Sequence, residues 1–73
     1  MDPGNFDSQH FEKKLMNLSN TQDSITGLSK WCIQRRNHHK LIVRSWLNVL
    51  KLGKFLSSAA VTKAYLIIIN SLS

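Results

Sequence analysis

The sequence predicts an all-α fold of three or four short helices. Apolar residues recur at intervals of three and four along most of the chain, which is the spacing of helices that bury one face. Short polar or glycine-containing breaks separate these stretches, at residues 19–21, 37–39 and 53–58. The 73 residues suffice for one small domain with a modest core.

Residues 1–8 are predicted to be a disordered lead-in, because Pro3 and Gly4 disfavour regular structure. Asp7 or Ser8 can cap a first helix, since a short side-chain oxygen accepts a hydrogen bond from a free backbone N–H. The apolar stripe of this helix has the spacing i, i+4, i+7 and comprises Phe11, Leu15 and Leu18.

A second helix is expected to run to about Arg36, capped by Asn20 or Thr21, with Asp23 in the first turn where the helix dipole favours an acid. Its apolar positions are Ile25, Leu28, Trp31 and Cys32. Gly27 weakens this helix by roughly 1 kcal/mol relative to alanine, so we expect it to allow close packing of a neighbouring helix.

A third helix is expected from about His39 to Leu52. Its predicted buried face consists of Ile42, Trp46, Val49 and Leu50, widened by Val43 and Leu47. Gly53 is predicted to end the helix as a left-handed C-cap.

Residues 54–73 form a divergent apolar tail with a candidate fourth helix over residues 59–70, which Ser57 or Ser58 can cap. Within it, residues 65–69 are β-prone and apolar on every face, so they need burial to avoid aggregation. The predicted division of the chain is 1–8, 9–53 and 54–73.

The charge is uneven along the chain. There are ten Lys and Arg residues against four Asp and Glu residues, giving a formal net charge of +6. Residues 24–73 carry eight of the basic residues and no acidic one. This pattern indicates an anionic partner such as a phosphopeptide, RNA or an acidic surface. Two other interpretations, a basic solvated face and acidic residues in a missing C-terminal half, together explain it equally well.

A basic cluster lies across the corner between the second and third helices and consists of Arg35, Arg36, Lys40 and Arg44. Phosphate contact and a merely solvated corner are both consistent with it. The two tryptophans, Trp31 and Trp46, have an aromatic face suited to stacking on bases. Their helical phase with Leu28 and Val49 favours core positions instead.

Catalysis and metal binding find little support in the sequence. His38 and His39 are adjacent, and neighbouring helix positions do not face the same point, so a surface pair is the preferred interpretation. Cys32 lies on an apolar stripe, which favours a packed thiol over a nucleophile. No carboxylate follows Asp23 and no glycine-rich phosphate loop is present. We therefore expect a non-enzyme without cofactor or metal.

The compartment is indicated only weakly. The single cysteine fits a reducing compartment such as cytosol or nucleus. The acidic start does not look like a signal peptide, and the longest apolar run, residues 64–69, is far below the roughly 20 residues that span a bilayer. We expect no membrane partner.

Several segments resemble one family in order and spacing: Phe11–Leu15, Leu18–Gln22, Ser24–Ile25, Leu28–Ile33, and then His39, Ile42–Val43 and Trp46. Over about residues 9–50 the chain resembles the start of the RNA polymerase II C-terminal-domain-interacting domain (CID) of "regulation of nuclear pre-mRNA domain-containing" proteins. The resemblance implies the first, truncated part of a right-handed α-superhelix similar to VHS and ENTH domains.

The resemblance also implies a function: non-enzymatic binding of the phosphorylated heptad repeats of the polymerase tail, in the nucleus, during transcription and pre-mRNA processing. By this resemblance Asn20 and Gln22 approach the peptide. Tyr65-Leu66 can be laid on the family's tyrosine-leucine-alanine-asparagine-aspartate signature, which places Tyr65 near the peptide's tyrosine.

The departure from this signature is substantial. Ile68 and Ile69 stand where asparagine and aspartate belong, and the later helices that supply a phosphate-binding arginine are absent. The tail is either a diverged fourth helix or unrelated sequence joined by alternative splicing or a read-through gene model, and we favour the second. We expect weak or lost peptide binding. The alternatives are a basic RNA-binding fragment and an interaction fragment that self-associates through exposed apolar faces.

Overall fold

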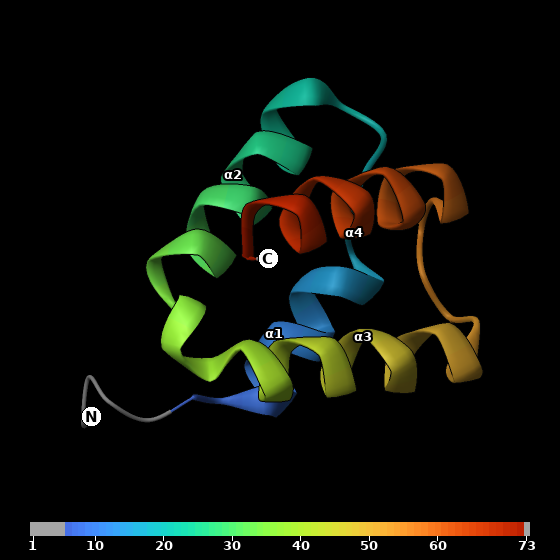
Figure 1. The fold of residues 1–73 in the computed structure, drawn as a ribbon. Helices are drawn as coiled ribbons and strands as arrows, with labels where there is room; N and C mark the ends of the chain where they lie inside the picture. The colour runs from blue at the N-terminus through green and yellow to red at the C-terminus, as the bar shows by residue number, and fades with distance from the viewer. Residues whose placement is uncertain (1–5, 73) are drawn as a thin grey trace.

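A computed structural model describes residues 6–72, which fold into four α-helices (Figure 1). They are α1 (Ser8–Met16), α2 (Gln22–Gln34), α3 (His39–Leu52) and α4 (Ser58–Leu72). A single 3-10 turn, η1 (Arg36–His38), joins α2 to α3. The predicted all-α class is confirmed. Of the predicted lead-in, residues 1–5 lie outside the described part, whereas Ser8 already begins a helix.

The helix ends are fixed by side-chain caps. Asp7 Oδ1 accepts a hydrogen bond from the backbone N–H of His10 at 3.1 Å, and Thr21 Oγ1 accepts one from Ser24 at 3.2 Å. Ser57 Oγ does the same at the start of α4. Each cap satisfies a backbone donor that has no partner inside its helix. Gly53 has φ +63°, which confirms the predicted left-handed C-cap of α3.

Two helices end earlier than expected. The first ends at Met16, so Leu18 lies in the following loop, although it is still buried. The second ends at Gln34, and Arg35 caps it rather than occupying its last turn. The chain then tightens into η1, whose His38 N–H donates to the carbonyl of Arg35 at 2.9 Å.

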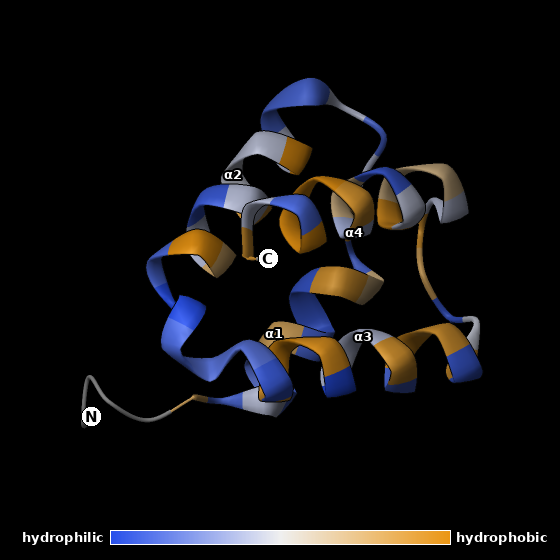
Figure 2. Ribbon diagram, viewed as in Figure 1, coloured by the Kyte–Doolittle hydropathy of each residue, from blue (hydrophilic) through white to orange (hydrophobic). Residues whose placement is uncertain are grey.

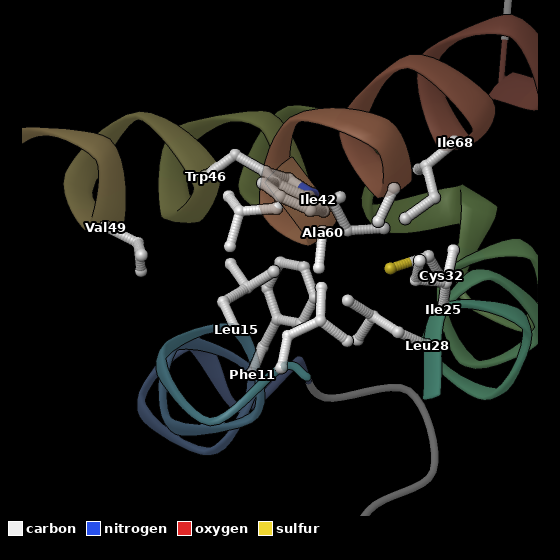
Figure 3. Close-up of a cluster of buried hydrophobic side chains, with 13 residues drawn as sticks. Phe11, Leu15, Ile25, Leu28, Cys32, Ile42, Trp46, Val49, Ala60 and Ile68 are labelled. Carbon is white, nitrogen blue, oxygen red and sulfur yellow. The ribbon is translucent and has the colours of Figure 1, made fainter. Parts of the chain in front are cut away.

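The helices pack in alternating pairs. Figure 1 shows α1 beside α3 and α2 beside α4, and these two pairs make the main helix contacts. All four helices point apolar side chains into one core (Figure 3). The backbone N–H of Leu56 also donates to the carbonyl of Met16 at 2.9 Å, which ties the α3–α4 loop to the end of α1.

The tail is part of this core. Four side chains of α4 are fully buried: Ala60, Val61, Ala64 and Ile68. Leu66 and Ile67 remain 59% and 37% exposed, so the stretch that we expected to need burial is only half covered. Apolar residues are frequent along both α3 and α4 (Figure 2). Within residues 6–72 no helix is long and apolar enough to cross a membrane.

Three expectations about side chains were wrong. Leu47 and Leu50 were placed on the buried face of α3 but are 48% and 43% exposed. Helix positions one apart differ by about 100°, and Ile42, Trp46 and Val49 already define the face that meets the core. Gly27 does not admit a neighbouring helix, because nothing lies within 4 Å of where its Cβ would be.

The two tryptophans differ in burial. Trp46 is fully buried, and its indole N–H has no hydrogen-bond partner within the described chain. Trp31 is only half-buried and packs at the edge of the core. The predicted core role therefore holds fully for Trp46 alone.

Candidate functional site

The corner between α1 and α2 carries two of the predicted peptide-binding residues. A hydrogen bond of 3.2 Å between the hydroxyls of Ser19 and Thr21, together with the Thr21 cap, holds the backbone here. Asn20 is exposed, and within residues 6–72 its amide has no hydrogen-bond partner. Gln22 is also exposed, but its Nε2 donates to Thr26 Oγ1 at 3.1 Å. The corner thus presents one free amide and one engaged amide to solvent.

Tyr65 lies on α4, the helix that packs against α2. Its half-buried ring meets Trp46 edge to face, with ring centroids 5.5 Å apart. This contact fixes the ring through α3 and not through the corner. The structure therefore brings together the helices that carry Gln22 and Tyr65, but within the described residues no hydrogen bond joins the two side chains.

The two isoleucines of the altered signature are not available for polar contacts. Ile68 is fully buried in the core, and Ile69 is half-buried beside it (Figure 3 labels Ile68). An alkyl side chain offers neither a donor nor an acceptor. A ligand at this face would lack the hydrogen bonds that an amide and a carboxylate give.

The basic cluster lies at the opposite end of α2 from Asn20. The thirteen residues of α2 separate the two ends by about 20 Å, at 1.5 Å per residue. Arg36, Lys40 and Arg44 are exposed, and no carboxylate pairs with them within residues 6–72. An extended peptide of about six residues covers this distance.

Arg35 is engaged inside the protein. Its guanidinium carbon lies 4.0 Å from the centroid of the Trp31 ring, and its Nη1 donates to the Trp31 carbonyl at 3.2 Å. A cation over an indole face is a stabilising contact, and the arginine must leave it to reach a phosphate directly. Of the four basic residues, Arg35 is the least free to contact a ligand.

The adjacent histidines His38 and His39 and the thiol of Cys32 have different surroundings. The His38 ring stacks on Phe6 with centroids 5.7 Å apart, whereas His39 is exposed at the start of α3. Within the described chain no three His, Cys, Asp or Glu residues are grouped to hold a metal. Cys32 is fully buried, and this burial raises the pKa of its thiol to about 12. Such a thiol is a poor nucleophile at neutral pH.

A groove of about 640 Å³ between α1 and α2 was not predicted from the sequence. Its lining residues are His10, Lys13, Lys14, Asn17, Leu18, Asp23, Ser24, Gly27, Leu28 and Trp31. The signal for it was Gly27, a glycine in a helix interior that we assigned to packing. The groove adjoins the corner with Asn20, since both use the chain between Asn17 and Asp23.

The chain is similar to known proteins over most of its length. The family model described as "CID domain" matches residues 9–69. "Regulation of nuclear pre-mRNA domain-containing protein 2" of Mus musculus is 42% identical over 40 residues, which are 55% of this chain and 3% of that protein.

Two other relatives match a longer stretch. "Regulation of nuclear pre-mRNA domain-containing protein 1A" of Gallus gallus is 43% identical over 49 residues, 67% of this chain and 18% of that protein. "CID domain-containing protein 1" of Caenorhabditis elegans is 41% identical over 46 residues, 63% of this chain and 15% of that protein. The chain thus covers less than a fifth of these relatives. No solved structure matches it.

Proposed function

Because the chain belongs to the CID domain family, we propose that it is a non-catalytic binding module related to the readers of the phosphorylated RNA polymerase II C-terminal repeat. Its work would lie in the nucleus, in transcription and pre-mRNA processing. The names of its relatives, which refer to the regulation of nuclear pre-mRNA, support this placement.

The observation that carries the proposal is the free amide of Asn20. By the family resemblance this corner faces the peptide, and Asn20 is exposed there and without a hydrogen-bond partner within residues 6–72. A short amide on a capped, rigid corner is suited to bond a peptide backbone or phosphate with little loss of conformational freedom. Arg36, Lys40 and Arg44 would contact phosphate at the far end of α2.

We infer that this affinity is weak. Ile68 and Ile69 supply no hydrogen bonds, and Tyr65 is half-buried against Trp46. Arg35 is held on Trp31. A site with so few polar contacts gains little against the entropy of ordering an extended peptide.

Fluorescence anisotropy of a labelled, doubly phosphorylated heptad peptide tests the proposal. We expect a dissociation constant no tighter than about 100 µM, equivalent to about 5.5 kcal/mol. The unphosphorylated peptide serves as control and should bind more weakly still. Micromolar binding that Asn20→Ala abolishes would show that the site is complete after all. Equal affinity for both peptides would remove the phosphopeptide reading.

The alternative is a basic RNA-binding fragment, which the eight basic residues of 24–73 favour. Its signature is affinity for any single-stranded RNA that falls steeply with salt, because binding releases counterions from the phosphates. Titration of an unstructured RNA at two salt concentrations separates the two functions. An affinity indifferent to salt would exclude the RNA interpretation.

A further inference from the structure

The groove lies between α1 and α2, which meet through the stacked rings of Phe11 and Trp31 but are not each other's main packing partners. Each finds its main partner elsewhere, α1 on α3 and α2 on α4. The resulting groove of about 640 Å³ lies in the size range of sites that bind ligands or short peptide segments. The groove adjoins the corner with Asn20, but its lining does not include Asn20, Gln22, Tyr65 or the basic cluster.

The floor of the groove is apolar. Leu18 and Leu28 line it and are 3% and 6% exposed, so each contributes a small apolar surface. Trp31 lies at one end with its ring stacked on Phe11, at a centroid distance of 5.0 Å. The Arg35 guanidinium also packs on this ring, so the indole has a fixed orientation before any ligand arrives.

Gly27 keeps the middle of the groove open. It is exposed on the α2 wall, and no atom lies within 4 Å of where a Cβ would be. Glycine in a helix interior costs roughly 1 kcal/mol relative to alanine. The sequence therefore carries an unfavourable residue at the point where any side chain would project into the groove.

The charge of the groove favours an anion. Lys13 and Lys14 line the α1 wall, whereas Asp23 is the single carboxylate in the lining. Within residues 6–72 neither lysine forms an ion pair. Both lysines are exposed, so a bound carboxylate would gain a cation that is not already neutralised.

We propose that this groove binds an acidic peptide segment carrying an apolar side chain. The apolar side chain enters beside Gly27 onto Leu28, and acidic residues on either side face Lys13 and Lys14. A second copy of this chain is disfavoured as the occupant, because its net charge of +6 is repelled by the lysines of the groove. The site is separate from the corner amide of Asn20 on which the proposed function rests.

The test uses the full chain and a fluorescein-labelled peptide of glutamates around a central Leu-Leu pair, followed by anisotropy in near-physiological salt. Gly27→Leu fills the opening and should weaken binding at least about tenfold, or about 1.4 kcal/mol. Gln34→Leu, which adds an exposed leucine to the same helix outside the groove, should change the affinity less than about twofold. Circular dichroism checks that both variants stay helical.

Charge is tested by a matched pair of double variants. Lys13→Glu with Lys14→Glu should weaken binding at least about tenfold. Lys51→Glu with Lys63→Glu makes the same change in net charge outside the groove and should have a far smaller effect, because salt screens distant charges. Equal losses in both pairs, or no effect of Gly27→Leu, would overturn the proposal.

Asn20→Ala separates this site from the proposed function. Binding of the unphosphorylated acidic peptide should be unchanged in this variant, whereas any phosphopeptide binding should fall. If Asn20→Ala abolishes both, the groove and the corner are one site and the inference fails. If the acidic peptide binds but the phosphopeptide does not, the inference stands and the proposed function fails.

Discussion

Cys32 shows how burial changes the chemistry of a single residue. Its side chain projects from α2 into the core and is fully buried (Figure 3). Loss of solvation disfavours the thiolate and raises the pKa from 9.0 to about 12, an effect that the Arg35 guanidinium partly offsets. The folded protein therefore keeps this thiol protonated at pH values where an unfolded chain releases the proton.

Stability should fall with rising pH through this one group. Between about pH 9 and about pH 12 the folded state holds one proton more than the unfolded state, so the slope reaches about 1.4 kcal/mol per pH unit. Below pH 9 the contribution is constant. Urea unfolding followed by circular dichroism from pH 8 to pH 11 measures it. Cys32→Ala cannot ionise, and identical slopes for both proteins would contradict the assigned burial.

The sequence allows the core role of Cys32 to be predicted, but not the difference between Trp31 and Trp46. Both tryptophans have the same helical phase with apolar neighbours. Burial differs because Trp31 lines the open groove between α1 and α2, whereas Trp46 lies fully within the core. Which side of a helix stays open to solvent depends on how all the helices assemble, and the apolar spacing within one helix does not predict it.

At the scale of elements, two neighbouring residues at the start of α2 are expected to have different roles, one in stability and one in binding. Thr21 caps the helix through its hydroxyl, whereas its neighbour Asn20 contributes no hydrogen bond within the described chain. Thr21→Ala should destabilise the protein by about 1 kcal/mol, since it leaves a backbone donor of the first turn without its partner. Asn20→Ala should leave the midpoint of urea unfolding unchanged.

The stabilities of Asn20→Ala and Thr21→Ala also serve as a control for the binding experiments. If Asn20→Ala destabilises as much as Thr21→Ala, the asparagine has a structural role and a loss of peptide binding no longer reports a contact. Thr21→Ser keeps the hydroxyl and should recover most of the lost stability. A midpoint for Thr21→Ser as low as that of Thr21→Ala would show that the hydroxyl is not the stabilising group.

Local residue chemistry predicted where helices begin and end better than it predicted which side of each helix is buried. Of the cap candidates Asp7 or Ser8 and Asn20 or Thr21, the structure uses Asp7 and Thr21, and Gly53 caps the third helix as predicted. The outer leucines of α3 were misplaced, because an apolar side chain fits the pattern of a buried face whether or not another helix covers it. The β-prone residues 65–69 are helical, which shows contacts with α2 overriding local propensity.

At the scale of the whole molecule, two properties oppose each other. Large apolar side chains are exposed on α3, α4 and the loop between them: Leu47, Leu50, Leu52, Leu56, Leu66 and Ile67. The net charge of +6 repels a second copy. The role of Asn20 and Gln22 stays a prediction from the family resemblance, whereas this balance appears only when all helices are in place.

Salt should therefore promote weak self-association. Screening shortens the range of charge repulsion from about 30 Å at 0.01 M to about 3 Å at 1 M ionic strength, while the apolar contacts persist. Sedimentation velocity at two protein concentrations should show a concentration-dependent increase at 1 M salt and none at 0.01 M. Leu47→Ser with Leu66→Ser should remove the increase, whereas Ile33→Ser, an exposed residue on α2, should not. Association that weakens with salt would instead indicate charge pairing and contradict the apolar mechanism.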